Sequence, residues 1–191
     1  LWGREIGAVS WLDDREIGVF QYAPEFVGSG IEVAPLMMSL RETPYEFPGL
    51  PRDAFKGLPG LLADSLPDKF GNAVIDAWLA AQGRSPESFN PVERLCYIGA
   101  RGMGALEFEP SILGSPTRGR KLEVAALVDL ANKVLNDRRA LSGTLDGEHD
   151  AKAIEDIIRV GTSAGGARAK AILVWNEATG EFRSGQVKAD Q

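Results

Sequence analysis

The stretch DSLPDKFGNAVIDAWLAAQG, residues 64–83, decides the fold expected for the first half of the chain. Its apolar residues recur at intervals of three and four, which is the spacing of one face of an α-helix. Ser65 is a suitable N-cap, Pro67 suits the first turn, and Asp68 lies where a negative charge stabilises the helix dipole. Gly83 is a suitable stop. The stretch therefore predicts a helix, whose apolar face holds Phe70, Ala73, Val74, Ala77 and Trp78.

Strand-like segments precede this helix. REIGAVSWLDD and REIGVFQYA, residues 4–14 and 15–23, are two short runs that meet at Asp13 and Asp14, which predicts a β-hairpin. APLMMSLRETPYEF, residues 34–47, predicts another extended segment that prolines interrupt. The pattern predicts an α+β fold, in which a mainly antiparallel sheet packs against helices.

A second helix is predicted after the first. The stretch NPVERLCYIG has an Asn cap at Asn90 and a proline at the next position, so we expect a helix from Pro91 to Tyr97. GARGMGALEFEP, residues 99–110, is typical of a glycine turn that leads into a strand. We therefore expect a first domain over residues 1–110.

The remainder of the chain has a different organisation. SILGSPTRGRK, residues 111–121, is rich in Gly, Pro, Ser and Arg and is the best linker candidate. A strongly periodic helix is predicted from Leu122 onward, and two short strands are predicted around the turn EATG, residues 177–180. Residues 122–191 therefore form the expected second, incomplete region.

Composition excludes several classes of function. The 191 residues carry 21 Lys and Arg against 27 Asp and Glu, a net charge of −6, so the chain lacks the overall basic charge of a nucleic-acid-binding protein. The local cluster Arg118, Arg120 and Lys121 is better interpreted as a solvated linker. Neither an apolar run of about 20 residues nor a signal peptide is present, and we expect a cytoplasmic protein without membrane contact.

Cysteine and histidine chemistry is almost absent from the sequence. The single cysteine, Cys96, excludes an internal disulfide and is interpreted as a small buried residue. With one histidine, His149, the chain cannot assemble a zinc site of the usual kind, and no G-x-S-x-G motif accompanies that histidine. The pair Asp64 and Asp68 is interpreted as helix-start acids rather than a catalytic dyad. The four tryptophans are interpreted as packing residues.

A glycine-rich stretch, RVGTSAGGARAKAILVW at residues 159–175, is the strongest candidate for a ligand site. Glycine backbones can approach phosphates closely, because no Cβ blocks the amides. The spacing matches neither a Walker loop nor a dinucleotide-binding fingerprint, since a strand rather than a helix follows. A kinase-type loop between antiparallel strands agrees with the pattern. From the residues alone, a phosphate-covering loop and an ordinary hairpin turn both remain open.

Four blocks of the chain, in order and spacing, resemble the amino-terminal part of the HipA-type toxin kinases. They read VFQYAPEF (19–26), APLMMSLRETPYEF (34–47), FKGLPGLLADSLPDKFG (55–71) and LCYIGARGMGALEFEP (95–110). Ala63 stands where many relatives have proline, a mild departure. The resemblance implies a coupling domain over residues 1–110, followed by the first strands of a kinase-like small lobe.

The resemblance also implies an activity and site residues. These kinases transfer the γ-phosphate of ATP, with Mg²⁺, to a protein hydroxyl, and each is the toxin of a bacterial toxin–antitoxin pair. The implied partner is a small DNA-binding antitoxin, through which DNA is contacted only indirectly. By the same resemblance, the loop residues that lie at the ATP phosphates are Ser163, Gly165, Gly166, Ala167, Arg168 and Lys170. Of these, Ser163 stands where such kinases often carry a self-phosphorylated serine.

The sequence lacks the rest of a kinase site. A kinase needs a strand lysine, a catalytic Asp with its Asn, and a metal-binding Asp. Lys188 is a poor candidate for the strand lysine because its neighbours are polar, and no catalytic or metal-binding residue is assigned. We expect an amino-terminal fragment of a longer kinase that is inactive alone. The alternative is a non-catalytic interaction module that binds an antitoxin.

Overall fold

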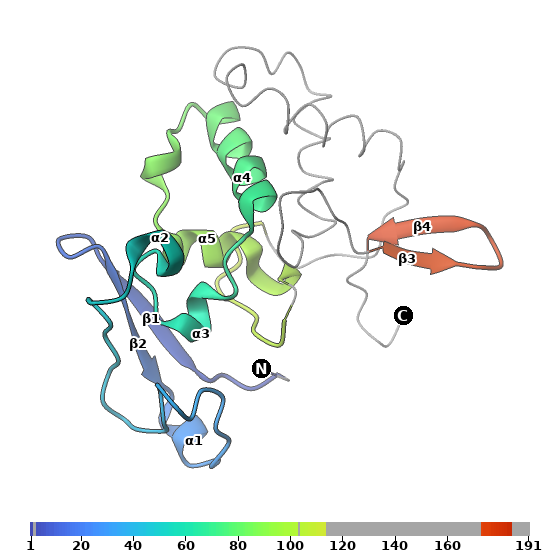
Figure 1. Ribbon diagram of the computed structural model, residues 1–191. Coiled ribbons are helices and arrows are strands. Elements are labelled where there is room, and N and C mark those ends of the chain that lie inside the picture. Colours follow the sequence, from blue (N-terminus) through green and yellow to red (C-terminus); the bar gives the residue numbers. More distant parts are fainter. Residues whose placement is uncertain (2, 103, 114–172, 185–191) are drawn as a thin grey trace.

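A computed structural model describes residues 1, 3–102, 104–113 and 173–184 (Figure 1). The elements in chain order are β1 (Gly7–Leu12), β2 (Ile17–Tyr22), α1 (Pro24–Val27), α2 (Arg52–Phe55), α3 (Gly60–Ala63), α4 (Lys69–Ala81), the 3₁₀ helix η1 (Pro86–Ser88), α5 (Pro91–Ile98), the 3₁₀ helix η2 (Gly99–Arg101), β3 (Leu173–Asn176) and β4 (Glu181–Ser184). Helices and antiparallel strands coexist, which confirms the predicted α+β class.

Both predicted hairpins are present. β1 pairs with β2 in antiparallel register, with Val9 opposite Phe20. β3 pairs with β4 in the same way, and the Asn176 side chain accepts hydrogen bonds from two backbone amides of the turn. Gly180 completes that turn with a φ of +68°, a conformation that favours glycine. Alternating apolar residues and local turn chemistry therefore predicted these elements correctly.

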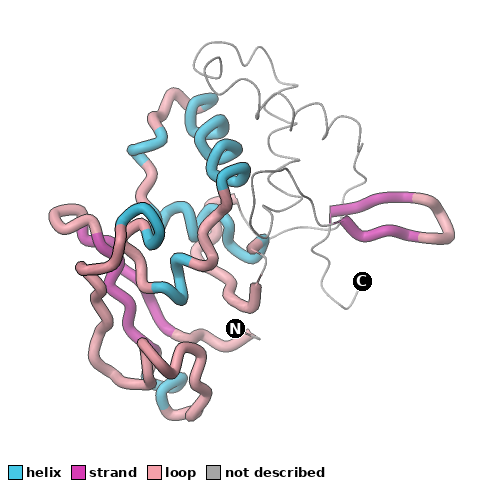
Figure 2. Tube along the Cα trace, viewed as in Figure 1, coloured by secondary structure: helices cyan, strands magenta, loops and turns pink. Residues whose placement is uncertain are grey.

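The expected larger sheet is not found among the described residues. Most of the chain between α1 and α2 is loop, and in this segment Tyr45 alone forms a bridge, to Phe20 (Figure 2). Residues 34–47 are therefore not the predicted extended segment. The first five residues of this segment form a turn, in which the Met38 amide donates to the Ala34 carbonyl at 2.8 Å. The prolines of the segment also lack the N–H donors that a strand would need.

The strand predicted within residues 99–110 is also absent from the described part of this range, residues 99–102 and 104–110. Gly99 begins η2 instead, and the Phe108 amide returns to the Gly99 carbonyl at 3.2 Å, so the segment closes as a loop. Gly99 has a φ of +57°, and a Cβ there would meet the Ser111 hydroxyl. Gly99 thus marks a close approach of Ser111 rather than entry into a strand, whereas a Cβ at Gly104 would meet nothing within 4 Å.

α4 is present, but its start differs from the prediction. Asp68, not Ser65, is the N-cap, because its carboxylate accepts a hydrogen bond from the Gly71 amide at 2.8 Å. The buried face contains Phe70, Val74 and Ala77 of the predicted set and adds Ile75 and Leu79, whereas Ala73 and Trp78 are only partly buried. Gly83 lies just past the end with a φ of +70°, which confirms the predicted stop.

α5 begins as predicted and ends one residue later, at Ile98. Asn90 accepts from the Glu93 amide at 2.9 Å, and the Glu93 carboxylate accepts from the Asn90 amide at 2.8 Å. This reciprocal capping box fixes the helix start. At the other end, the buried Arg101 guanidinium donates to the Tyr97 and Ile98 carbonyls, where a cation stabilises the helix dipole.

The core joins the first hairpin to the helices. Its buried members come from β2, α1, the loop after α1, the turn between α2 and α3, α3 and α5, and they are Phe20, Tyr22, Phe26, Met38, Tyr45, Leu58, Leu62 and Leu95. A second cluster links α4 to α5 through Trp78, Phe89 and Tyr97, with ring centroids 4.9–6.2 Å apart. These contacts confirm that Trp78 is a packing residue.

Candidate functional site

The six predicted loop residues all lie outside the described residues. Ser163, Gly165, Gly166, Ala167, Arg168 and Lys170 therefore receive no structural description. The β3–β4 hairpin that follows them is described, and Trp175 on β3 is half exposed. The interpretation of the glycine-rich stretch as a phosphate-covering loop stays a prediction.

The described residues contain a different candidate, an open groove of about 930 Å³ beside α4. Small residues of α4 line it at helical spacing, namely Ala73, Ala77 and Ala80. Polar residues from α4 and α5 line the same groove and are Asp68, Lys69, Asn72, Asp76 and Arg94. We call this feature the α4 groove. Small side chains along the helix leave room for a ligand to approach the backbone closely.

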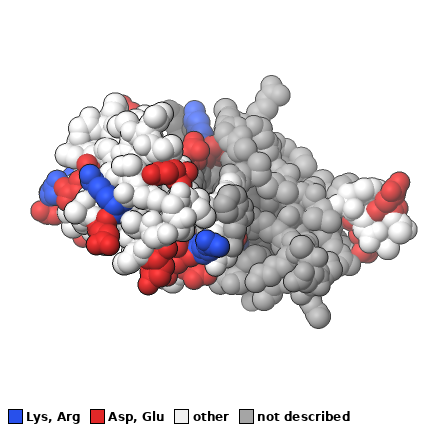
Figure 3. Space-filling model, turned by 90° about the horizontal axis from the view of Figure 1, so that it is seen from below, with Lys and Arg blue, Asp and Glu red and all other residues white. Residues whose placement is uncertain are grey.

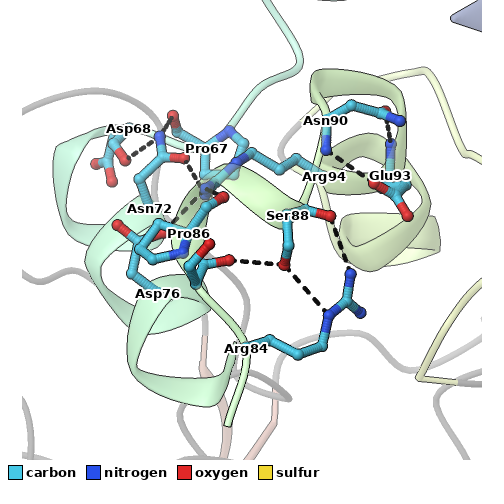
Figure 4. Close-up of polar contacts among 11 residues, drawn as sticks. Pro67, Asp68, Asn72, Asp76, Arg84, Pro86, Ser88, Asn90, Glu93 and Arg94 are labelled. Atoms are coloured by element: carbon cyan, nitrogen blue, oxygen red, sulfur yellow. Dashed lines mark hydrogen bonds and ion pairs between the residues drawn. The ribbon is translucent and has the colours of Figure 1, made fainter. Parts of the chain in front are cut away.

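Arg94 organises the polar side of the α4 groove (Figure 4). Its guanidinium donates to the Asn72 side chain at 2.8 Å and to the Asp76 carboxylate at 2.9 Å. It also donates to the Pro86 carbonyl at 3.2 Å. One side chain of α5 therefore ties together two successive turns of α4 and the start of η1.

Backbone contacts hold the members of this network in place. The side-chain NH2 group of Asn72 donates to the Pro67 and Asp68 carbonyls, which leaves the side-chain oxygen directed at Arg94. On the η1 side, Arg84 donates to the Ser88 hydroxyl and carbonyl (Figure 4). The Asn72 side chain, one Asp76 oxygen and the Arg94 guanidinium thus have hydrogen-bond partners within the protein.

Arg94 engages part of the acceptor set of the α4 groove. The Asn72 oxygen and one Asp76 oxygen accept hydrogen bonds from its guanidinium. Among the described residues, no group of three or more His, Cys, Asp or Glu could hold a metal ion. Asp68 caps the start of α4, as the helix-start interpretation predicts, whereas Asp64 lies at the C-cap of α3, so that interpretation is wrong for Asp64.

Sequence reasoning missed the Asn72–Asp76–Arg94 network. A partial signal exists, because residues four apart on a helix lie on one face, and Asn72 and Asp76 have that spacing. The partner Arg94 lies 18 residues from Asp76 and reaches it only through the packing of α5 on α4. The sequence pattern therefore contains no signal for the completed network.

Cys96 does not have the environment of a reactive cysteine. Burial raises the pKa of its thiol, and the nearby Glu93 carboxylate acts in the same direction. The residue is half-buried rather than fully buried as predicted. A raised pKa keeps the sulfur protonated and weakly nucleophilic, so the side chain serves packing.

The surface of the first 113 residues is acidic. Within this range the sequence has nine Lys and Arg against sixteen Asp and Glu. On the face seen in Figure 3, acidic side chains cover more area than basic ones. None of the described helices combines the length and the apolar character needed to cross a bilayer.

The order of hairpin, loop and capped helices agrees with the four sequence blocks described above. The family model of the HipA N-terminal domain matches residues 1–109. The chain belongs to this family. The HipA N-terminal domain thus contains the β1–β2 hairpin, the α4 groove and the Arg94 network. No curated protein and no solved structure matches the chain.

Proposed function

We propose that the chain is the amino-terminal part of a HipA-like serine/threonine kinase, the toxin of a bacterial toxin–antitoxin pair. The observation that carries this proposal is the family match over residues 1–109. The glycine-rich stretch of residues 159–175 supports it, since the stretch resembles the phosphate-covering loop of these kinases. In this proposal the first domain binds a partner, and the later region contributes to the ATP site.

The proposed partner is a small DNA-binding antitoxin. A DNA-binding protein carries basic surface, and the acidic surface of residues 1–113 is complementary to it. The α4 groove offers a second contact region, with a rigid polar edge set by Arg94 and a floor of small residues. DNA itself would be reached only through the antitoxin.

The proposed role of the glycine-rich loop is to hold the phosphates of ATP. Gly165, Gly166 and Ala167 would present backbone amides, which bind anions well where side chains do not obstruct them. Arg168 and Lys170 would add charge-assisted contacts. MgATP supplies the phosphoryl group that the complete kinase transfers to a protein hydroxyl, and Ser163 is a candidate for self-phosphorylation. The proposal places no metal ligand among the described residues.

The ATP assignment is tested by calorimetry on the full-length protein. A branched Cβ at Gly166 would block the approach of the phosphates, so Gly166→Val is expected to lower ATP affinity at least tenfold. Arg168→Ala removes one charge-assisted contact, about 1.5–3 kcal/mol, and leaves the backbone amides in place. Gly49→Val is the matched control, because a Cβ at Gly49 meets nothing within 4 Å. Unchanged ATP affinity in a folded Gly166→Val protein would contradict the proposal and would show that the stretch is an ordinary hairpin turn.

A non-catalytic docking module is the second candidate. One observation favours it: the hydrogen bonds of Arg94 to Asn72 and Asp76 hold the polar edge of the α4 groove in a fixed geometry, which suits a binding surface. ATP titration separates the two candidates. A full-length protein that binds the antitoxin but neither binds nor consumes ATP would establish the docking module and reject the kinase.

A further inference from the structure

The loop between α1 and α2 presents two large apolar side chains to water. Leu36 is 95% exposed and Met37 is 67% exposed, whereas the next residue, Met38, is 1% exposed within the core. Most exposed apolar residues occur singly, and adjacent ones in a held geometry are typical of interaction sites. We call residues 34–38 the apolar turn.

The apolar turn is held rigidly. The Met38 amide closes it by donating to the Ala34 carbonyl at 2.8 Å. The Tyr22 hydroxyl donates to the Met38 carbonyl at 2.8 Å, and the Tyr45 hydroxyl donates to the Ser39 carbonyl. Because both tyrosines belong to the core, Leu36 and Met37 project from a fixed base. Such preorganisation reduces the entropy lost when a partner binds.

The surroundings of the apolar turn are acidic. Glu32 and Glu42 are exposed on the same loop, and Glu32 lies near enough to accept a hydrogen bond from the Leu40 amide at 3.5 Å. The cation of this loop, Arg41, has its guanidinium 3.6 Å from the centre of the Tyr45 ring and donates to the Pro44 carbonyl, and it keeps its positive charge. Residues 28–51 hold three acids, Glu32, Glu42 and Glu46, against this one cation, so the loop that carries the apolar turn has a net negative charge.

We propose that the apolar turn is a docking site for a protein whose apolar pocket receives Leu36 and Met37 and whose rim is basic. Complementary charge around a small apolar centre is a common arrangement in protein interfaces. A second copy of this acidic chain would bring like charges together, and an anionic membrane would be repelled in the same way. The inference deepens the proposed function, because a DNA-binding antitoxin is one basic protein of this kind.

The first experiment uses the full-length protein in its native cell, with a photo-crosslinking amino acid at position 36. A matched protein carries it at position 49, on the loop that leads to α2. The proposal expects one basic protein to be crosslinked through position 36 and not through position 49. Crosslinks to a second copy, to lipid, or to no specific protein would each overturn it.

The second experiment measures the affinity of the crosslinked protein, after purification, for variants of the full-length chain. Leu36→Ser combined with Met37→Ser is expected to weaken binding at least a hundredfold without lowering the melting temperature, since both side chains lie outside the core. Ile112→Ser is the control, because Ile112 is also a large exposed residue, at 45%, and belongs to a different segment. Equal affinity of the double variant and the control would overturn the proposal.

The third measurement addresses charge. Replacing Glu32 and Glu42 by glutamine is expected to lower the association rate about three- to tenfold at low salt and to flatten its salt dependence. An unchanged salt dependence would reject the basic rim. These outcomes are distinct from those that test the proposed function. If the crosslinked basic protein is not an antitoxin, the docking site stands and the antitoxin assignment is rejected. If the full-length protein does not bind ATP, the docking site is unaffected.

Discussion

Tyr22 shows how one side chain connects the core to the loop that follows. Its ring is buried against Phe20 and Phe26, and its hydroxyl donates to the Met38 carbonyl at the base of the apolar turn. Burial raises the pKa of Tyr22 to about 12, and the nearby Tyr45 and Glu32 act in the same direction. The residue therefore makes the stability of the domain dependent on pH in the alkaline range.

The sign of this dependence follows from linkage. An unfolded tyrosine ionises near pH 10.0, whereas the folded one keeps its proton up to about pH 12. The stability that Tyr22 contributes is complete below about pH 10 and is lost as the pH rises through the folded pKa. We predict that the free energy of unfolding, measured by urea titration, falls more steeply above about pH 10 in the wild type than in Tyr22→Phe. Equal slopes in the two proteins would contradict the raised pKa.

Arg94 and Arg15 form ion pairs of similar length in different surroundings. The Arg94–Asp76 distance is 2.9 Å and the Arg15–Glu46 distance is 2.8 Å. The Arg94 side chain is 15% exposed, whereas the Arg15 side chain is 42% exposed. Exposed pairs contribute little because water screens them, and a partly buried hydrogen-bonded charge contributes more.

We predict that Arg94→Met lowers the free energy of unfolding by about 1–2 kcal/mol, because it removes bonds to Asn72, Asp76 and Pro86. The half-exposed Asp76 keeps the effect from being larger. Arg15→Met, the matched control, is expected to cost less than about 1 kcal/mol. Urea denaturation of both variants measures the difference, and the reverse order of the two effects would show that the network contributes nothing.

At the scale of elements, the α4 start tests how a helix selects its cap. The sequence offers Ser65 and Asp68, and both are residue types that cap helices. The structure uses Asp68, whose carboxylate accepts from the Gly71 amide, while Ser65 lies before Pro67 in the turn after α3. Pro67 has no backbone N–H, so it could not donate a hydrogen bond to a Ser65 side chain that acted as the N-cap.

We predict that Asp68→Ala lowers the free energy of unfolding by about 0.5–2 kcal/mol, because it removes the N-cap of α4. Ser65→Ala is expected to change it by less than about 0.5 kcal/mol. Asp68→Asn should restore most of the loss, since an asparagine oxygen also caps. A larger effect at Ser65 than at Asp68, in the same denaturation experiment, would mean that the helix starts as the sequence alone indicates.

At the scale of the whole molecule, net charge limits the possible partners. The chain carries −6 overall, and the excess of acid falls in the first 113 residues. Affinity for nucleic acid depends on the release of counterions by clustered Lys and Arg. A protein with a net negative charge gains little from this effect.

We therefore predict that the chain alone does not bind duplex DNA at physiological salt, and that it joins DNA only through a basic partner. Fluorescence anisotropy with a labelled duplex measures this, first with the chain alone and then with the antitoxin added. The antitoxin alone is the control. Tight, salt-dependent binding of DNA by the chain alone would show that the cluster at Arg118, Arg120 and Lys121 contacts nucleic acid rather than solvent.

Prediction from sequence succeeded where the signal is local. The β1–β2 hairpin follows from alternation around an acidic turn, and the start of α5 follows from Asn90 and the proline after it. The extended segment 34–47 failed because the same apolar residues suit either a strand or a turn. The conformation of this segment depends on packing against the core, in which Met38 is buried while Leu36 and Met37 stay exposed.

The sequence by itself determined the α+β class, the β1–β2 hairpin, the two main helices and the family, because turn residues, caps and apolar spacing act over a few neighbouring residues. Only the tertiary structure decided which residues form the α4 groove and which apolar residues remain in water. Arg94 meets Asp76 because α5 packs on α4, and the apolar turn projects because Tyr22 and Tyr45 hold its base. These contacts join residues far apart in the chain, and no local pattern specifies such a meeting.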